Sequence, residues 1–121
     1  METNKKLLTN DSITDESKRH CFRMTDDSMD DGLIHSYENR SIVFTHEISK
    51  DYLKSRYGQW DAFVIVHNTE DIIIRQIVAY DAEKDVITLH SFNPNYHDCD
   101  VSLKDVTHIY YVYGKQTLKM A

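Results

Sequence analysis

Ser28 and Arg75 are the residues of this chain whose types could meet in one reaction. Ser28 lies in an acidic segment, residues 25–29 (Thr-Asp-Asp-Ser-Met), and Arg75 lies in a strand-like run, residues 72–77 (Ile-Ile-Ile-Arg-Gln-Ile). A serine hydroxyl becomes a nucleophile when a neighbouring lysine, desolvated until it is neutral, accepts its proton. A guanidinium keeps its proton at any accessible pH and cannot act in this way. The pair therefore predicts a hydrolase scaffold with a disabled base.

Histidine is an alternative base, because its neutral form exists at pH 7. Four histidines lie on or beside predicted strands: His46, His67, His90 and His108. A metal site is also conceivable at residues 97–100 (His-Asp-Cys-Asp), but structural zinc needs a second pair of closely spaced ligands. No second pair exists in the sequence, so we expect a solvated loop there, with no metal and no cofactor.

The composition limits the partners and the compartment. The chain has 121 residues, enough for one domain, and a formal net charge of −6, which argues against direct binding to nucleic acid. Cys21 and Cys99 are the only cysteines, and two are few for a secreted disulfide scaffold. Neither a transmembrane-length apolar stretch nor a signal-peptide core is present. We expect a cytoplasmic protein with reduced thiols and no membrane contact.

Two parts are expected along the chain. Residues 1–20 are polar and charged and are interpreted as a flexible arm, whereas residues 21–121 form a β-rich domain. Alternating and apolar runs predict strands at residues 41–45, 62–67, 71–80, 85–90, 101–103 and 107–113. Polar turns at residues 67–71 and 81–85 predict hairpin connections.

One helix is predicted, at residues 50–57. Ser49 can cap its first turn, and Ile48 and Leu53 have the spacing of a hydrophobic staple. Short strands with turns between them and a single short helix indicate a mostly-β, half-open barrel or sandwich. These elements must bring Ser28 and Arg75 onto neighbouring strands if the two side chains are to meet.

Six segments in order now resemble the LexA/UmuD-type Ser-Lys autopeptidases, a signal-peptidase-like superfamily. Residues 22–29 look like the strand and Gly-Asp-Ser-Met motif of its nucleophile, and residues 72–77 look like its Val-x-Val-Lys-Arg-Leu segment. Residues 89–96 (Leu-His-Ser-Phe-Asn-Pro-Asn-Tyr) are similar to its Leu-x-Ser-x-Asn-Pro-x-Tyr loop. The remaining similar segments are residues 39–43, 60–67 and 101–106, the last followed by a Tyr-rich terminal strand.

The resemblance implies a LexA C-terminal-domain-like fold, with Ser28 at the nucleophile position and Arg75 at the position of the lysine base. Asp26 replaces the glycine of the family motif. The family cleaves itself at a small-residue bond, typically Ala-Gly, upstream of the serine, and residues 1–27 contain neither Ala nor Gly. The base and the internal substrate are both missing, which points to a catalytically inactive member.

The leading interpretation is a non-catalytic regulatory or protein-interaction domain, related to phage-repressor and SOS-type regulators. The alternative is a serine endopeptidase acting on itself or on another chain, with Ser28 as nucleophile and an atypical base. For Arg75 we hypothesise a structural role, as a tether to the nearby carboxylates Asp26, Asp27, Asp30 and Asp31.

Two kinds of partner are expected. An inactive peptidase groove can hold a protein or extended peptide by adding it as a strand to a sheet edge. In residues 110–113 (Tyr-Tyr-Val-Tyr), Tyr111 and Tyr113 share one face of the last strand, while Tyr110 and Val112 share the other. One face is expected in the core and the other at a contact, which makes a homodimer through the C-terminal strand possible.

Overall fold

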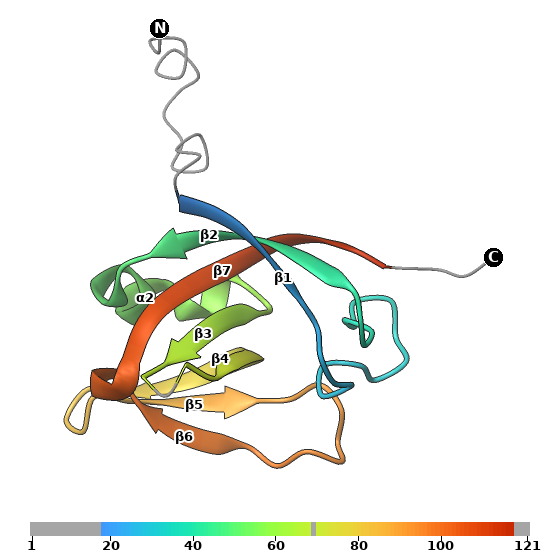
Figure 1. Cartoon of the computed structure of the whole chain (residues 1–121). Coiled ribbons are helices and arrows are strands. Elements are labelled where there is room, and N and C mark those ends of the chain that lie inside the picture. Colours follow the sequence, from blue (N-terminus) through green and yellow to red (C-terminus); the bar gives the residue numbers. More distant parts are fainter. Residues whose placement is uncertain (1–17, 69, 118–121) are drawn as a thin grey trace, which may run out of the picture.

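The computed structural model describes residues 18–68 and 70–117, and its main elements are strands (Figure 1). The elements are β1 (Arg19–Arg23), β2 (Ile42–Ile48), α2 (Lys50–Arg56), η3 (Tyr57–Gln59), β3 (Phe63–His67), β4 (Ile72–Asp81), β5 (Val86–His90), β6 (Cys99–Ser102), η4 (Leu103–Asp105) and β7 (Val106–Gln116). The fold is therefore mostly β, as predicted.

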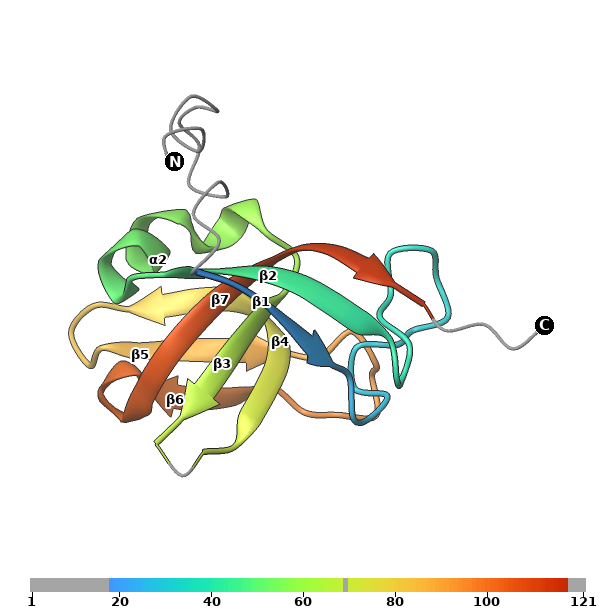
Figure 2. The same cartoon turned by 45° about the horizontal axis from the view of Figure 1, so that its top comes forward.

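The described strands form one open, antiparallel sheet in the order β1-β2-β7-β3-β4-β5-β6. The sheet curls, so that β1 crosses in front of β7 and approaches the side on which β3 and β4 lie (Figures 1 and 2). Strand β4 changes partners along its length: residues 72–75 pair with β3, and the pairing with β5 starts at Gln76. This change leaves one edge of the first half of β4 without a neighbouring strand.

Both faces of the curled sheet carry buried side chains. Tyr111 belongs to the larger cluster, with Leu53, Phe63 and Ile65 among its members. Tyr110 and Val112 belong to a second cluster on the other face. The expectation that one face of the last strand is left for a partner is therefore wrong for these residues, because both faces are packed. Of the three tyrosines only Tyr113 is exposed.

The predicted helix is present and begins as expected. The Ser49 hydroxyl accepts a hydrogen bond from the Tyr52 amide at 3.1 Å, and Leu53 is fully buried. Ile48 packs against the same cluster as Leu53. The cap satisfies a free amide of the first turn, and the apolar pair fixes the angle at which the chain enters α2.

Four strands differ from the sequence prediction. β2 runs to Ile48 instead of ending at residue 45, and β7 runs to Gln116 instead of ending at residue 113. β1 was not predicted from the residue pattern, although the family resemblance implied a strand before Ser28, and it begins at Arg19, inside the expected arm, most of which lies outside the described residues. Only Phe22 of its five residues is partly buried, and an arginine stands at each end, so the apolar pattern is weak. β6 comprises Cys99–Ser102, and Leu103 already belongs to η4. None of the helices in the described part of the chain is long and apolar enough to span a membrane.

Candidate functional site

The Ser28 side chain is fully buried and hydrogen-bonded on both sides. Its hydroxyl donates to Asp26 Oδ1 at 2.7 Å, and its backbone N–H donates to the same oxygen at 3.0 Å. Arg75 Nη1 donates to Ser28 Oγ at 2.7 Å. The two residues singled out from the sequence are thus in direct contact, although 47 positions separate them.

Arg75 connects the Ser28 turn to the free edge of β4. Its Nη1 also donates to the carbonyl of Ile74 at 2.8 Å, and its guanidinium lies 5.7 Å from the centre of the Tyr96 ring. Within the described residues no carboxylate pairs directly with Arg75. The hypothesis of a tether to an acidic side chain is therefore corrected: Arg75 reaches the loop through the Ser28 hydroxyl, which in turn is held by Asp26.

The loop after β5 holds the Ser28 turn from the other side. The Asn93 amide donates to the Ser28 carbonyl at 2.9 Å, and Asn93 Nδ2 donates to the Asp27 carbonyl at 3.0 Å. The Tyr96 hydroxyl donates to Asp27 Oδ1 at 2.7 Å. This hydrogen bond is the main reason that the pKa of Tyr96 is raised above its ordinary value. The turn is therefore fixed through both its backbone and its carboxylates.

The hydrogen bonds around Ser28 engage the groups that nucleophilic catalysis would need to be available. A serine nucleophile must give its proton to a base, and its own backbone N–H commonly stabilises the oxyanion that forms. Here the hydroxyl proton and the N–H of Ser28 both point to Asp26 Oδ1. Asp26 Oδ1 thus accepts from the backbone N–H of Ser28 that would otherwise stabilise an oxyanion. The guanidinium of Arg75, a permanent cation, donates to a lone pair of Ser28 Oγ.

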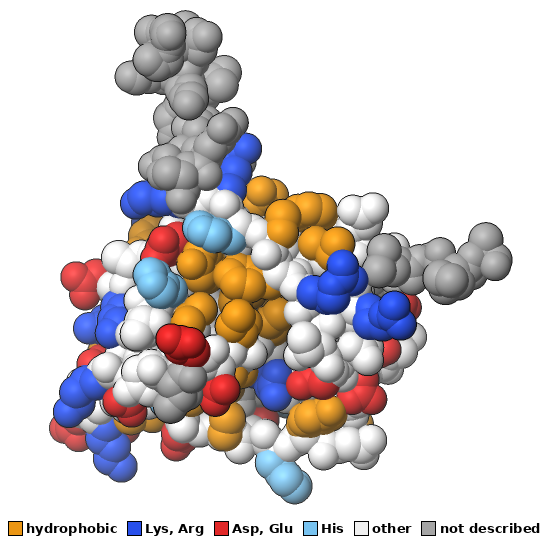
Figure 3. Space-filling view, in the orientation of Figure 1, with side chains coloured by type: hydrophobic (Ala, Val, Ile, Leu, Met, Phe, Trp, Pro, Cys, Tyr) orange, Lys and Arg blue, Asp and Glu red, His pale blue; other side chains and the backbone are white. Residues whose placement is uncertain are grey.

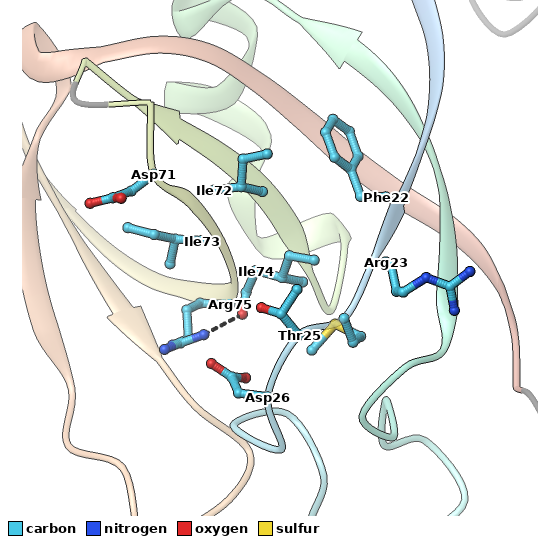
Figure 4. A pocket seen from close by; sticks show the side chains of 10 residues that line it. Phe22, Arg23, Thr25, Asp26, Asp71, Ile72, Ile73, Ile74 and Arg75 are labelled. Atoms are coloured by element: carbon cyan, nitrogen blue, oxygen red, sulfur yellow. Dashed lines mark hydrogen bonds between the residues drawn. The ribbon is translucent and has the colours of Figure 1, made fainter.

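A groove of about 350 Å³ runs from this site along the free edge of β4 (Figure 4). Residues 22–26, which comprise the end of β1 and the chain that follows it, line one bank, and residues 71–75 line the other. Apolar side chains gather in the middle of the same face of the molecule (Figure 3). The groove thus has an apolar floor beside two backbone segments.

Both banks direct backbone groups into the groove. The Asp71 carbonyl accepts from the His67 amide of β3. Because alternate residues of an antiparallel strand face its partner, the N–H and C=O of Ile72 and Ile74 face away from β3. On the other bank, both backbone groups of Met24 bond toward residues 40–41, so those of Arg23 and Thr25 face the open side. An extended chain in the groove would meet donors and acceptors on both sides.

A family model described as Peptidase S24-like matches residues 2–113. The chain belongs to this family. The LexA/UmuD-type resemblance is thereby confirmed for nearly the whole chain. No curated protein and no solved structure matches the sequence.

Membership in the S24-like family gives the contact between Ser28 and Arg75 its meaning, since these are the residues at the expected nucleophile and base positions. Their roles stay predictions. In the described part of the chain no histidine bonds to the Ser28 hydroxyl: His46 bonds to the Glu47 carbonyl, and His90 to Asp98. No group of three metal-ligating side chains occurs among the described residues.

Sequence reasoning missed the parts played by Asp26, Asn93 and Tyr96. The sequence analysis treats Asp26 as a replacement for the family glycine and as a candidate partner of Arg75, not as the hydrogen-bond partner of Ser28. An aspartate two positions before a serine is a common local turn motif, and this spacing could have revealed the contact. The bonds from Asn93 and Tyr96 to the Ser28 turn span more than 60 residues and have no local signal.

Proposed function

We propose that this S24-like chain is a non-catalytic regulatory domain that binds an extended segment of a partner protein in the groove between β1 and β4. The contact at Ser28 carries the proposal. Its hydroxyl donates to Asp26 and accepts from Arg75, both at 2.7 Å. An arginine cannot take the proton of the serine, so the lysine-dependent reaction is closed to this pair.

The groove supports the binding part of the proposal. Ile72 and Ile74 on one bank, and Arg23 and Thr25 on the other, offer backbone groups that an added strand would pair with. Ile72 is 52% exposed, whereas Ile74 is almost fully buried within the apolar floor. Main-chain bonds would provide affinity, and the apolar floor would select the side chains of the guest.

The test is a binding measurement with pools of acetylated pentapeptides. Wild-type protein is expected to retain extended, apolar-rich members, and those peptides are expected to be recovered uncut. Ser28→Ala is the control for chemistry, because it removes the hydroxyl and leaves both banks of the groove in place. Failure to retain any peptide would remove the binding proposal.

A second candidate function, a serine endopeptidase, is favoured by one specific contact. Asp26 Oδ1 is the group that holds the Ser28 proton, so a live site of this geometry would use Asp26 as its base. Comparison of the cleaved proteins in cells carrying wild type or Ser28→Ala decides between the two functions. Fragments that depend on Ser28 would establish the peptidase and end the non-catalytic proposal.

A further inference from the structure

Arg75 has N–H donors at the end of the groove that its two hydrogen bonds do not use. A guanidinium carries five N–H groups. The hydrogen bonds to Ser28 and to Ile74 both come from Nη1, and no side chain or carbonyl in the described residues accepts from Nε or Nη2. Nε and Nη2 form the side of the guanidinium that matches both oxygens of a carboxylate.

Arg75 also changes which hydrogen bonds the open edge of β4 can form with a guest chain. The carbonyl of Ile74 faces the groove, where an added strand would offer it an N–H, but Arg75 Nη1 already bonds to it at 2.8 Å. A guest chain that continued past this point would have to share this carbonyl with the guanidinium, which weakens the hydrogen bond to its own N–H. A guest that ends here presents only acceptors, namely the two oxygens of its α-carboxylate.

We propose that the groove recognises the C-terminal end of a peptide, with its free α-carboxylate on Arg75. This inference rests on the proposed binding function and names the class of ligand. β1 and β4 run in the same direction, because four antiparallel pairings relate them in the sheet order. A guest whose last residue reaches Arg75 would run parallel to both strands.

Two carboxylates lie close to the proposed position and limit the affinity. Asp26 accepts from both donors of Ser28, and Asp27 accepts from the Tyr96 hydroxyl. Removal of one of these charges should strengthen the binding of an anionic chain end, since like charges repel across a partly buried site. Asp26→Asn, which keeps the shape of the side chain, provides that variant.

The experiment uses two pools of acetylated pentapeptides with the same randomised sequences, one with free C-terminal acids and one with C-terminal amides. Retention by the full-length protein is quantified by mass spectrometry. Wild type is expected to prefer acids by about tenfold, the scale of a hydrogen-bonded charge pair at a partly exposed site. The preference should vanish in Arg75→Gln and persist in Arg56→Gln, which removes the same charge from α2.

Each outcome decides something. Equal retention of acids and amides by wild type would overturn the carboxylate inference and leave groove binding intact. Retention of neither pool would overturn both. An acid preference that survives Arg75→Gln would place the carboxylate elsewhere. If the retained peptide amides are enriched in a terminal Asp or Glu, the protein recognises a side-chain carboxylate instead of the α-carboxylate, which also contradicts the inference.

Two variants guard against loss of the fold in Arg75→Gln. Arg75→Lys keeps the positive charge without the fork of donors, and it should lose most of the preference for acids. Asp26→Asn leaves Arg75 intact, and it should raise the ratio of acid to amide retention above the wild-type value. An unchanged ratio in Asp26→Asn would contradict the placement of the carboxylate beside Asp26.

Discussion

Ser28 occupies the expected nucleophile position of an S24-like scaffold, and its contacts are those of a structural residue. The hydroxyl is buried, its proton points to Asp26, and Arg75 donates to its oxygen. Each contact would hinder attack on a substrate, and together they place the Ser28 hydroxyl at the centre of a hydrogen-bonded turn. The two substitutions that matter, at positions 26 and 75, act on the same atom.

Reversal of both substitutions should give Ser28 the reactivity of a nucleophile. In the double variant Asp26→Gly with Arg75→Lys, the proton and the backbone N–H of Ser28 are released and a titratable base stands beside the oxygen. We expect Ser28-dependent labelling by a fluorophosphonate probe, read by intact mass, that rises with pH as the lysine loses its proton. The triple variant with Ser28→Ala is the control. A double variant that stays unlabelled at every pH would show that the site is not a disarmed catalytic pair.

Arg75 should also contribute to stability. Arg75→Ala removes hydrogen bonds to a buried hydroxyl and to the edge of β4, so we expect a loss of about 1–3 kcal/mol in the free energy of unfolding. Urea denaturation measures it, and Arg56→Ala on the surface of α2 is the matched control. A difference between the two variants within about 0.5 kcal/mol would refute the tether.

Part of the site could be predicted at this scale and part could not. The resemblance of residues 22–29 and 72–77 to the nucleophile and lysine segments of the family predicted that Ser28 and Arg75 lie together, and they do. The spacing of Asp26 and Ser28 indicates their local contact, but the sequence does not reveal that Asp26 leaves Arg75 without a carboxylate partner, because that depends on how the turn packs against β4. The support from Asn93 and Tyr96 requires the long-range packing of the loop after β5.

At the scale of elements, β4 matters most because its two halves have different partners. Its second half pairs with β5, whereas residues 72–75 have β3 on one side and the groove on the other. The strand and its two turns were predictable from apolar runs between polar turns. The change of partner at Gln76 was not, because it depends on where β5 can reach the sheet.

Ile72→Pro tests the open edge of β4. The N–H of Ile72 faces away from β3, so proline at this first position of the strand removes a donor of the groove without breaking the ladder to β3. We expect a melting temperature close to that of wild type and a loss of peptide retention. Ile72→Thr, which keeps the N–H, is the matched control and should still bind. Full retention by the proline variant would mean that peptides bind elsewhere.

At the scale of the whole molecule, the end of β7 is a second place where another chain could add. β3 pairs with β7 only as far as Tyr111, with one further bond from Val112, so residues 113–116 have β2 on one side alone among the described strands. Tyr113 is exposed there, and Lys115 bonds to the carbonyl of Ile34, an apolar residue that is 95% exposed. This surface is the one on which we expect a homodimer.

The dimer makes a prediction of its own. Substitution of Ile34→Asp with Tyr113→Asp places two charges in the expected interface, and it should convert a dimer into a monomer by light scattering after size-exclusion chromatography. Ile72→Asp, which places a charge on the other exposed surface, should leave the dimer unchanged. A wild-type chain that is already monomeric at high concentration would contradict the expectation.

The whole-molecule measurement that tests the central claim most directly is the fate of peptides that the groove retains. Wild type and Ser28→Ala are incubated with randomised decapeptides, and bound and free peptides are sequenced by mass spectrometry. A non-catalytic binding groove predicts that both proteins retain the same peptides and that all are recovered intact. Cleavage products that appear with wild type and not with Ser28→Ala would show that Ser28 still works as a nucleophile, in contradiction to the proposal.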